Sequence, residues 1–151
     1  NVSIKWPNDI YWRDRKAAGI LIENSFRGPI WQWSIAGMGV NINQTSFGPE
    51  LNKAVSLKQI TGNTHAVKDL AVQLCGCIEV ALDILVIQGP DALIALYNNA
   101  LYKKGELVTV AVNEVVKTVT ICRVLPNGYL EIENENGTKE SVALGAVKWL
   151  S

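Results

Sequence analysis

The chain has 151 residues, of which 48% are hydrophobic and 19% charged, a composition typical of a packed globular core and not of a disordered chain. Its 14 basic residues balance its 14 acidic ones. A balanced charge gives no general attraction to nucleic acid or to an anionic membrane, so we expect neither as a partner.

The cysteines and the hydropathy pattern bear on where the protein works. Cys75, Cys77 and Cys122 form no C-x-x-C pair. We expect them to be small buried hydrophobes in a reducing cytosol. No signal peptide is seen, and the most apolar stretch, residues 80–87, is too short to span a bilayer. We therefore expect a cytoplasmic protein.

The first 43 residues read as short strands joined by tight turns. The pattern predicts strands at residues 2–6, 10–12, 19–24 and 30–37. The turns between them are too short for crossover helices. The sequence therefore predicts a meander of mainly antiparallel strands.

The next sixty residues have the periodicity of helices. A short helix is predicted at residues 55–60, stopped by Gly62. Thr64 is a good N-cap for a longer helix that reaches Leu85, and a third helix is predicted at residues 91–101. Strands and helices together predict an α+β domain over residues 1–103.

A second unit is expected at residues 104–151. Strands are predicted at residues 106–112, 118–124, 129–133, 139–144 and 147–149. Asn127-Gly128 and Asn136-Gly137 are strong hairpin signals. Short strands in so few residues predict a small SH3-like barrel.

Three polar groups are expected to meet between the first strands. Pro7 fixes its own φ, and Asn8 and Asp9 are turn formers whose side chains bond nearby backbone. Lys16 follows seven residues later, before a buried strand. Taken singly, the Pro-Asn-Asp turn and a solvated turn lysine are structural features, but together they form a candidate site.

Four stretches of the sequence relate this candidate site to a known protein family. They are Lys5-Trp6-Pro7-Asn8-Asp9, the segment from Arg15 to Glu23 (Arg-Lys-Ala-Ala-Gly-Ile-Leu-Ile-Glu), the segment from Gly37 to Asn43, and Ala54-Val55-Ser56-Leu57. Their order and spacing resemble the catalytic core of biotin protein ligases, the biotin–[acetyl-CoA-carboxylase] ligase family. The resemblance implies the latter half of a class II synthetase-like catalytic domain, a mixed and mainly antiparallel sheet with helices, followed by the SH3-like domain.

The same resemblance implies a reaction. The family uses ATP and Mg²⁺ to activate biotin as biotinyl-5′-adenylate, and then transfers the acyl group to a lysine of a biotin carboxyl carrier domain. Some relatives form homodimers, so a homodimer is a possible partner state here. These residues contain no helix-turn-helix pattern, so the repressor activity known in some members is not assigned from them.

Two residues match the catalytic positions of the family. Lys16 matches the lysine that faces the acyl-phosphate, where a unit charge pair at about 4 Å is worth roughly 4 kcal/mol at an effective dielectric of 20. Asp9 matches the aspartate beside it. Asp9 has three possible roles, which the sequence leaves open: binding Mg²⁺, orienting Lys16 or a missing arginine, or receiving the acceptor lysine.

The remaining matches are binding positions. Glycines at three of them would let biotin or adenylate approach the backbone. Asn41 matches the asparagine that contacts the nucleotide, Asn8 would add a neutral hydrogen bond, and Trp6 would form a wall. The three glycines are Gly19, Gly37 and Gly39.

One departure from the family pattern limits the prediction. The Gly-Arg-rich loop that precedes Lys-Trp-Pro-Asn-Asp in the family has no counterpart in these residues. We therefore expect a fragment with an incomplete site, inactive when isolated. Two alternatives stay open: a non-catalytic module that binds a carrier domain or a second subunit, and a lipoate-ligase-like acyltransferase.

Overall fold

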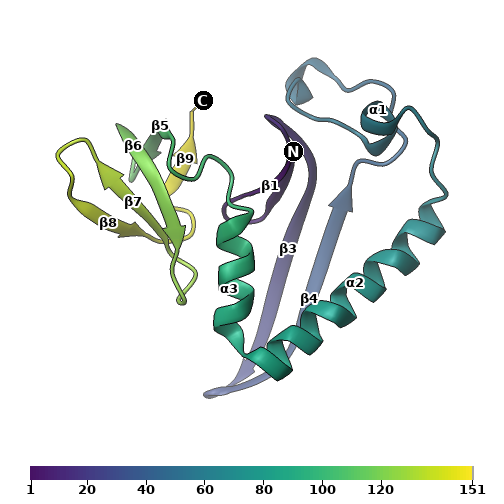
Figure 1. The fold of residues 1–151 in the computed structure, drawn as a ribbon, viewed down its shortest axis with the longest axis horizontal. Helices are drawn as coiled ribbons and strands as arrows, with labels where there is room; N and C mark the ends of the chain where they lie inside the picture. Colours follow the sequence, from purple (N-terminus) through teal and green to yellow (C-terminus); the bar gives the residue numbers. More distant parts are fainter. Residues whose placement is uncertain (151) are drawn as a thin grey trace. The chain divides into compact units, whose positions relative to one another are not determined.

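The computed structural model describes residues 1–150, and Figure 1 shows the order of their elements. The chain forms two compact units, Asn1–Val72 and Gln73–Ser151, each described below by itself. The division falls within a long helix. The predicted boundary between residues 103 and 104 stays a prediction.

The first unit is built on a four-stranded antiparallel sheet in the order β1-β2-β3-β4. Its strands are β1 (Val2–Lys5), β2 (Asp9–Trp12), β3 (Arg15–Arg27) and β4 (Ile30–Val40). The predicted meander is confirmed, but β3 and β4 form a hairpin much longer than the predicted runs (Figure 1).

The core of this unit lies where the chain returns to the start of β3. Trp6, Tyr11 and Ala17 are buried there together with Ala54 and Val55. The Lys16 amide donates to the Lys53 carbonyl at 2.7 Å, and the Val55 amide donates to the Lys16 carbonyl at 2.9 Å. These two bonds hold residues 53–55, which follow β4 in the chain, against the beginning of β3.

A capping box begins the helix α1 (Leu57–Thr61), which follows the short 3-10 helix η1 (Pro49–Leu51). The Gln59 amide donates to the Ser56 hydroxyl at 3.1 Å, and the Ser56 amide donates to the Gln59 side chain at 3.2 Å. The predicted helix at residues 55–60 therefore begins two residues late, because Ser56 caps it. Gly62 ends it in the left-handed region, with φ 78°.

The predicted N-cap of the long helix was wrong. The helix α2 (Val67–Gln88) begins three residues after Thr64. The intervening backbone is engaged elsewhere, because the His65 amide donates to the Asn43 side chain at 2.9 Å and the Asn43 amide group donates back to the His65 carbonyl at 2.8 Å. These two bonds hold residue 65 outside the helix.

The helix α2 is mostly apolar, yet none of its residues is buried in the part of the chain that the structure describes. By length and composition alone it is long enough to cross a membrane. Our expectation considered only residues 80–87, which are too short. The predicted burial of Cys75 and Cys77 was also wrong, because both lie on α2 and are exposed; all three cysteines are free thiols.

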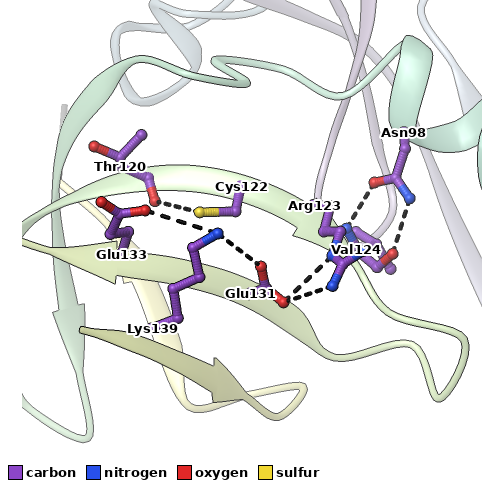
Figure 2. A network of polar contacts seen from close by, with 8 residues as sticks. All are labelled: Asn98, Thr120, Cys122, Arg123, Val124, Glu131, Glu133 and Lys139. Atoms are coloured by element: carbon purple, nitrogen blue, oxygen red, sulfur yellow. Dashed lines mark hydrogen bonds and ion pairs between the residues drawn. The ribbon is translucent and has the colours of Figure 1, made fainter. Parts of the chain in front are cut away.

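In the second unit, the helix α3 (Pro90–Asn99) is bonded to the strand β6 (Val115–Val124). The Asn98 side chain accepts from the Val124 amide at 2.6 Å and donates to the Val124 carbonyl at 2.8 Å (Figure 2). One side chain thus satisfies both backbone groups at the end of β6.

The predicted barrel is not closed. The second sheet is antiparallel and open, in the order β8-β7-β6-β5-β9. Its other strands are β5 (Leu107–Val112), β7 (Leu130–Asn134), β8 (Lys139–Val142) and β9 (Val147–Trp149). Closure would need β8 to pair with β9, but β9 has three residues and pairs with β5. Within residues 1–150 no ladder joins β8 to β9.

The sheet of the second unit is apolar on one face and charged on the other. Val110, Val119, Ile121, Leu130 and Ile132 are fully buried. The opposite face carries ion pairs from Arg123 to Glu131 at 3.1 Å, and from Lys139 to Glu131 at 3.8 Å and Glu133 at 3.9 Å (Figure 2). The arginine and lysine of these pairs are more than half exposed, and exposed ion pairs stabilise a fold by about 0–1 kcal/mol each. Burial raises the pKa of the thiol of Cys122, which precedes Arg123 on β6.

The cap of α1 gives a stability prediction. Ser56 is fully buried, and its hydroxyl also donates to the Gln44 carbonyl at 2.6 Å. Ser56→Ala should lower the free energy of unfolding by about 1–3 kcal/mol, because it removes a cap and leaves buried groups unsatisfied. Urea denaturation measures this change. Ser46→Ala, at an exposed position of the same loop, should cost less than about 0.5 kcal/mol. Equal effects would contradict the prediction.

Candidate functional site

The site is centred on an ion pair between β2 and β3. The Lys16 ammonium lies 2.6 Å from an Asp9 carboxylate oxygen, and their side chains are 45% and 25% exposed. A register shift produces this contact: Ile10 pairs with Ala18 but Tyr11 pairs with Lys16, so Ala17 is left without a partner. The bulge turns Lys16 to the face of the sheet that carries Asp9.

The backbone of Lys16 is held from three directions. Besides its bonds to Lys53 and Val55, its carbonyl accepts a hydrogen bond from the Asn41 side chain at 3.3 Å. Lys16 also forms a parallel bridge with Ala54. The start of its side chain is therefore fixed, while the half-exposed ammonium stays accessible to an anion.

Three glycines form a floor beside the ion pair. Asp9 pairs with Gly19, Gly19 with Gly39, and Leu21 with Gly37, so these residues share one face of the sheet. A Cβ at Gly19 would lie 3.1 Å from Asp9 Oδ1 and 3.2 Å from Lys16 Nζ. Gly37 and Gly39 meet only backbone oxygens at 3.8 and 4.0 Å. A flat ligand can therefore lie against this backbone next to one cation and one anion.

The sequence reasoning missed two further residues of this face, Lys5 and Tyr11. Lys5 pairs with Asp9 across β1 and β2, and its ammonium donates to the Tyr11 hydroxyl at 3.2 Å and lies 4.9 Å from the ring centroid. Burial lowers the pKa of Lys5, and the positive charges of Lys53 and Lys16 lower it further, while Asp9 opposes them. Burial and the Asp9 charge raise the pKa of Tyr11. The two-residue alternation of β2 was the signal that could have placed Tyr11 beside Asp9.

The other predicted binding residues make structural contacts within the chain. The Asn8 amide group donates to the Ile20 carbonyl at 2.7 Å, and the Ile20 amide donates to the Asn8 carbonyl at 2.9 Å, which ties the turn to β3. Asn41 follows β4 and contacts Lys16. Trp6 is 4% exposed and lies in the core. Contacts of these three with a ligand stay predictions.

The chemistry around Asp9 limits what a metal ion would find here. Among residues 1–150 no cluster of three histidine, cysteine or acidic side chains is placed to hold a metal. Mg²⁺ is often bound through one or two carboxylates together with substrate phosphates. The residues present therefore fit Mg²⁺ only as an ion that arrives with a nucleotide and has Asp9 as its one protein ligand.

Comparison with known proteins supplies the family. Residues 1–41, which hold the ion pair and the glycines, match the model of the Biotin/lipoate A/B protein ligase family. The apo structure of the biotin protein ligase from Aquifex aeolicus superposes on 99% of this chain, with a TM-score of 0.80 and 25% sequence identity. The chain belongs to the biotin protein ligase family.

The matches within this ligase family differ in how much of each relative they cover. Over 70 residues the chain is 40% identical to the biotin–[acetyl-CoA-carboxylase] ligase of Paracoccus denitrificans, which is 44% of this chain and 28% of that protein. The Aquifex aeolicus ligase in complex with biotin and ATP matches 97% of this chain and 61% of its own, with a TM-score of 0.79 and 25% identity. The apo chain is matched over 65% of its length. The chain thus spans less than two thirds of these ligases.

The charge cluster gives a prediction for Lys5. Because the Asp9 carboxylate raises the pKa of Lys5 against burial and two neighbouring lysines, Asp9→Asn should lower that pKa further. Carbon-detected NMR of the lysine Cε resonances measures it. Asp69→Asn, at an exposed position on α2, is the matched control and should leave it unchanged. An equal pKa of Lys5 in wild type and Asp9→Asn would show that Asp9 does not act on it.

Proposed function

We propose that this chain carries part of the active site of a biotin protein ligase, which activates biotin with ATP as biotinyl-5′-adenylate and transfers it to a lysine of a carrier domain. The observation that carries the proposal is the Lys16–Asp9 pair beside a floor of glycines. This arrangement offers one accessible cation next to exposed backbone. The relatives that the chain matches are biotin protein ligases.

In this proposal Lys16 is the catalytic residue. Its ammonium would face the biotin carboxylate and the α-phosphate, where negative charge accumulates as the acyl-phosphate bond forms. Three backbone contacts fix Lys16 before the ligand arrives. A group held in place in advance needs little reorganisation during the reaction, which is why such groups lower barriers.

Asp9 would hold Lys16 in position and stay close to the reacting groups. At 2.6 Å it is the ammonium's partner while no ligand is bound. An incoming carboxylate or phosphate would share the ammonium with Asp9. Mg²⁺, when bound with ATP, would neutralise charge on the phosphates, and Asp9 is the residue that would contact it.

The glycine floor would receive the flat part of the ligand. Biotin and the adenylate would lie along Gly19, Gly37 and Gly39, where no side chain stands in the way. Asn41, beside Gly39 in sequence, would contact the nucleotide. We further propose that the protein acts in the cytoplasm, and that a biotin carboxyl carrier domain is its protein substrate.

A binding experiment tests the role of Lys16. Biotinyl-5′-AMP titrated into the 151-residue chain by calorimetry should bind with a Kd in the micromolar range or tighter. Lys16→Ala should weaken binding about 10- to 150-fold, because a hydrogen bond to a charged group is worth about 1.5–3 kcal/mol. Lys68→Ala, at an exposed position on α2, should change nothing.

Three results would contradict this proposal. Equal affinity of wild type and Lys16→Ala would remove Lys16 from the site. An absence of adenylate binding, together with binding of an apo carrier domain, would favour the non-catalytic module. A lipoyl adenylate that binds more tightly than the biotinyl adenylate would favour the lipoate-ligase-like alternative.

The glycine floor has its own test, which uses two neighbouring residues of β4. Gly37→Val would raise a side chain on the floor, and Ala36→Val would place the same side chain on the opposite face. We expect Gly37→Val to weaken biotinyl-5′-AMP binding at least tenfold, because overpacking costs about 1–3 kcal/mol, without loss of thermal stability. Ala36→Val should bind normally. Equal affinity of the two variants would show that the ligand does not use this face.

A further inference from the structure

Lys5 lies at the end of a row of residues that crosses the first sheet. On β1 and β2, Lys5 pairs with Asp9. Asp9 in turn pairs with Gly19 of β3, and Gly19 pairs with Gly39 of β4. Residues that pair directly across strands share one face of the sheet. Because neighbouring strands lie about 4.8 Å apart, the backbone of Lys5 is about 10 Å from that of Gly19, and Asp9 stands between Lys5 and the glycine floor.

The buried Tyr11 side chain holds the ammonium group of Lys5. Tyr11 follows Asp9 by two residues, so it lies on the same face of the sheet, and it is 7% exposed. The Lys5 ammonium donates to the Tyr11 hydroxyl at 3.2 Å and lies 4.9 Å from the centre of its ring. Lys5 itself is only partly buried. Its charge is therefore held in position before a ligand arrives.

Positive charge is concentrated around Asp9. The Lys16 ammonium lies 2.6 Å from the Asp9 carboxylate, and the Lys53 carbonyl accepts from the Lys16 amide at 2.7 Å. Burial lowers the pKa of Lys5, and the positive charges of Lys53 and Lys16 lower it further. Three lysines thus gather around one carboxylate, although the 14 basic residues of the chain balance its 14 acidic ones. A local excess of positive charge of this kind attracts an anion with several charges.

The formation of an acyl adenylate requires room on two sides of the α-phosphate. An oxygen of the biotin carboxylate forms a bond to the α-phosphorus of ATP. The bond from this phosphorus to the oxygen that bridges to the β-phosphate breaks, and pyrophosphate leaves with the electron pair. The attacking and leaving oxygens lie roughly in line. With the carboxylate over the glycine floor and the α-phosphate at Lys16, the leaving group points across Asp9 toward Lys5.

We propose that Lys5, together with Lys53, binds the pyrophosphate that leaves ATP. This inference rests on the proposed function and assigns residues to the other product of the same step. Lys5 and Lys53 neutralise the negative charge that develops on the leaving oxygen, while Lys16 faces the acyl-phosphate. A lysine ammonium suits this task because it is a compact charge with three donors for phosphate oxygens.

Two separate titrations of the 151-residue chain test this inference. One uses inorganic pyrophosphate, and the other uses biotinyl-5′-AMP, which has no β- or γ-phosphate. Both are made at constant ionic strength and followed by NMR of the backbone amides and the lysine Cε resonances. Lys5→Gln should weaken the binding of pyrophosphate at least about tenfold, because it removes a hydrogen bond between charged groups. It should weaken the binding of biotinyl-5′-AMP much less, by under about threefold.

Two further variants make the test specific. Lys68→Gln removes the same charge from an exposed position on α2 in the same unit and should change neither affinity. Tyr11→Phe keeps Lys5 but removes the hydroxyl that holds it, so it should weaken pyrophosphate binding about 2- to 12-fold. Circular dichroism verifies that each variant folds, and Tyr11→Phe supplies the test should Lys5→Gln not fold.

Three outcomes would overturn the inference. The first is equal affinity of wild type and Lys5→Gln for pyrophosphate. The second is an equal loss of affinity for both ligands in Lys5→Gln, which would make the role of Lys5 structural. The third is displacement of pyrophosphate by an equal concentration of sulfate, which would show a general attraction to anions only. Failure of the proposed function is seen separately, as equal binding of biotinyl-5′-AMP by wild type and Lys16→Ala.

Discussion

The site depends on the bulge at Ala17. In a regular antiparallel ladder, Lys16 and Gly19 would point to opposite faces of β3, and the ammonium could not reach Asp9. The skipped residue turns Lys16 over, while Ala17 itself is buried against the returning loop. The 2.6 Å ion pair beside the glycine floor follows from this one change of register.

Much of this arrangement could be predicted from local sequence. Turn chemistry at Pro7-Asn8-Asp9 and the apolar run after Lys16 placed two strands and a turn correctly, and the structure brings Asp9 and Lys16 together. The bulge itself could not be predicted, because a register shift is decided by pairing across strands and not by neighbours in the sequence. The participation of Lys5 was missed for the same reason, whereas the two-residue alternation of β2 could have placed Tyr11 beside Asp9. The catalytic roles come from the family resemblance, since geometry alone shows an anion-accepting site.

The errors elsewhere share a physical origin. Period and turn signals located every strand of the second unit, but closure depends on whether β8 meets β9, which no local pattern encodes. Thr64 has the chemistry of an N-cap, yet Asn43 engages the backbone of His65 from a distant part of the chain and delays the helix. The cysteines of α2 were expected inside because free cysteine is usually buried, but none of the residues of α2 is buried in the described part of the chain.

The bond between Asn98 and Val124 has a mechanical consequence. Because one amide side chain holds both backbone groups at the end of β6, the last turn of α3 is coupled to the second sheet by side-chain bonds as well as by the chain itself. A displacement of that sheet would therefore also displace the last turn of α3. Strain applied to β6 would then reach α3 without passing through the linker at residues 100–106.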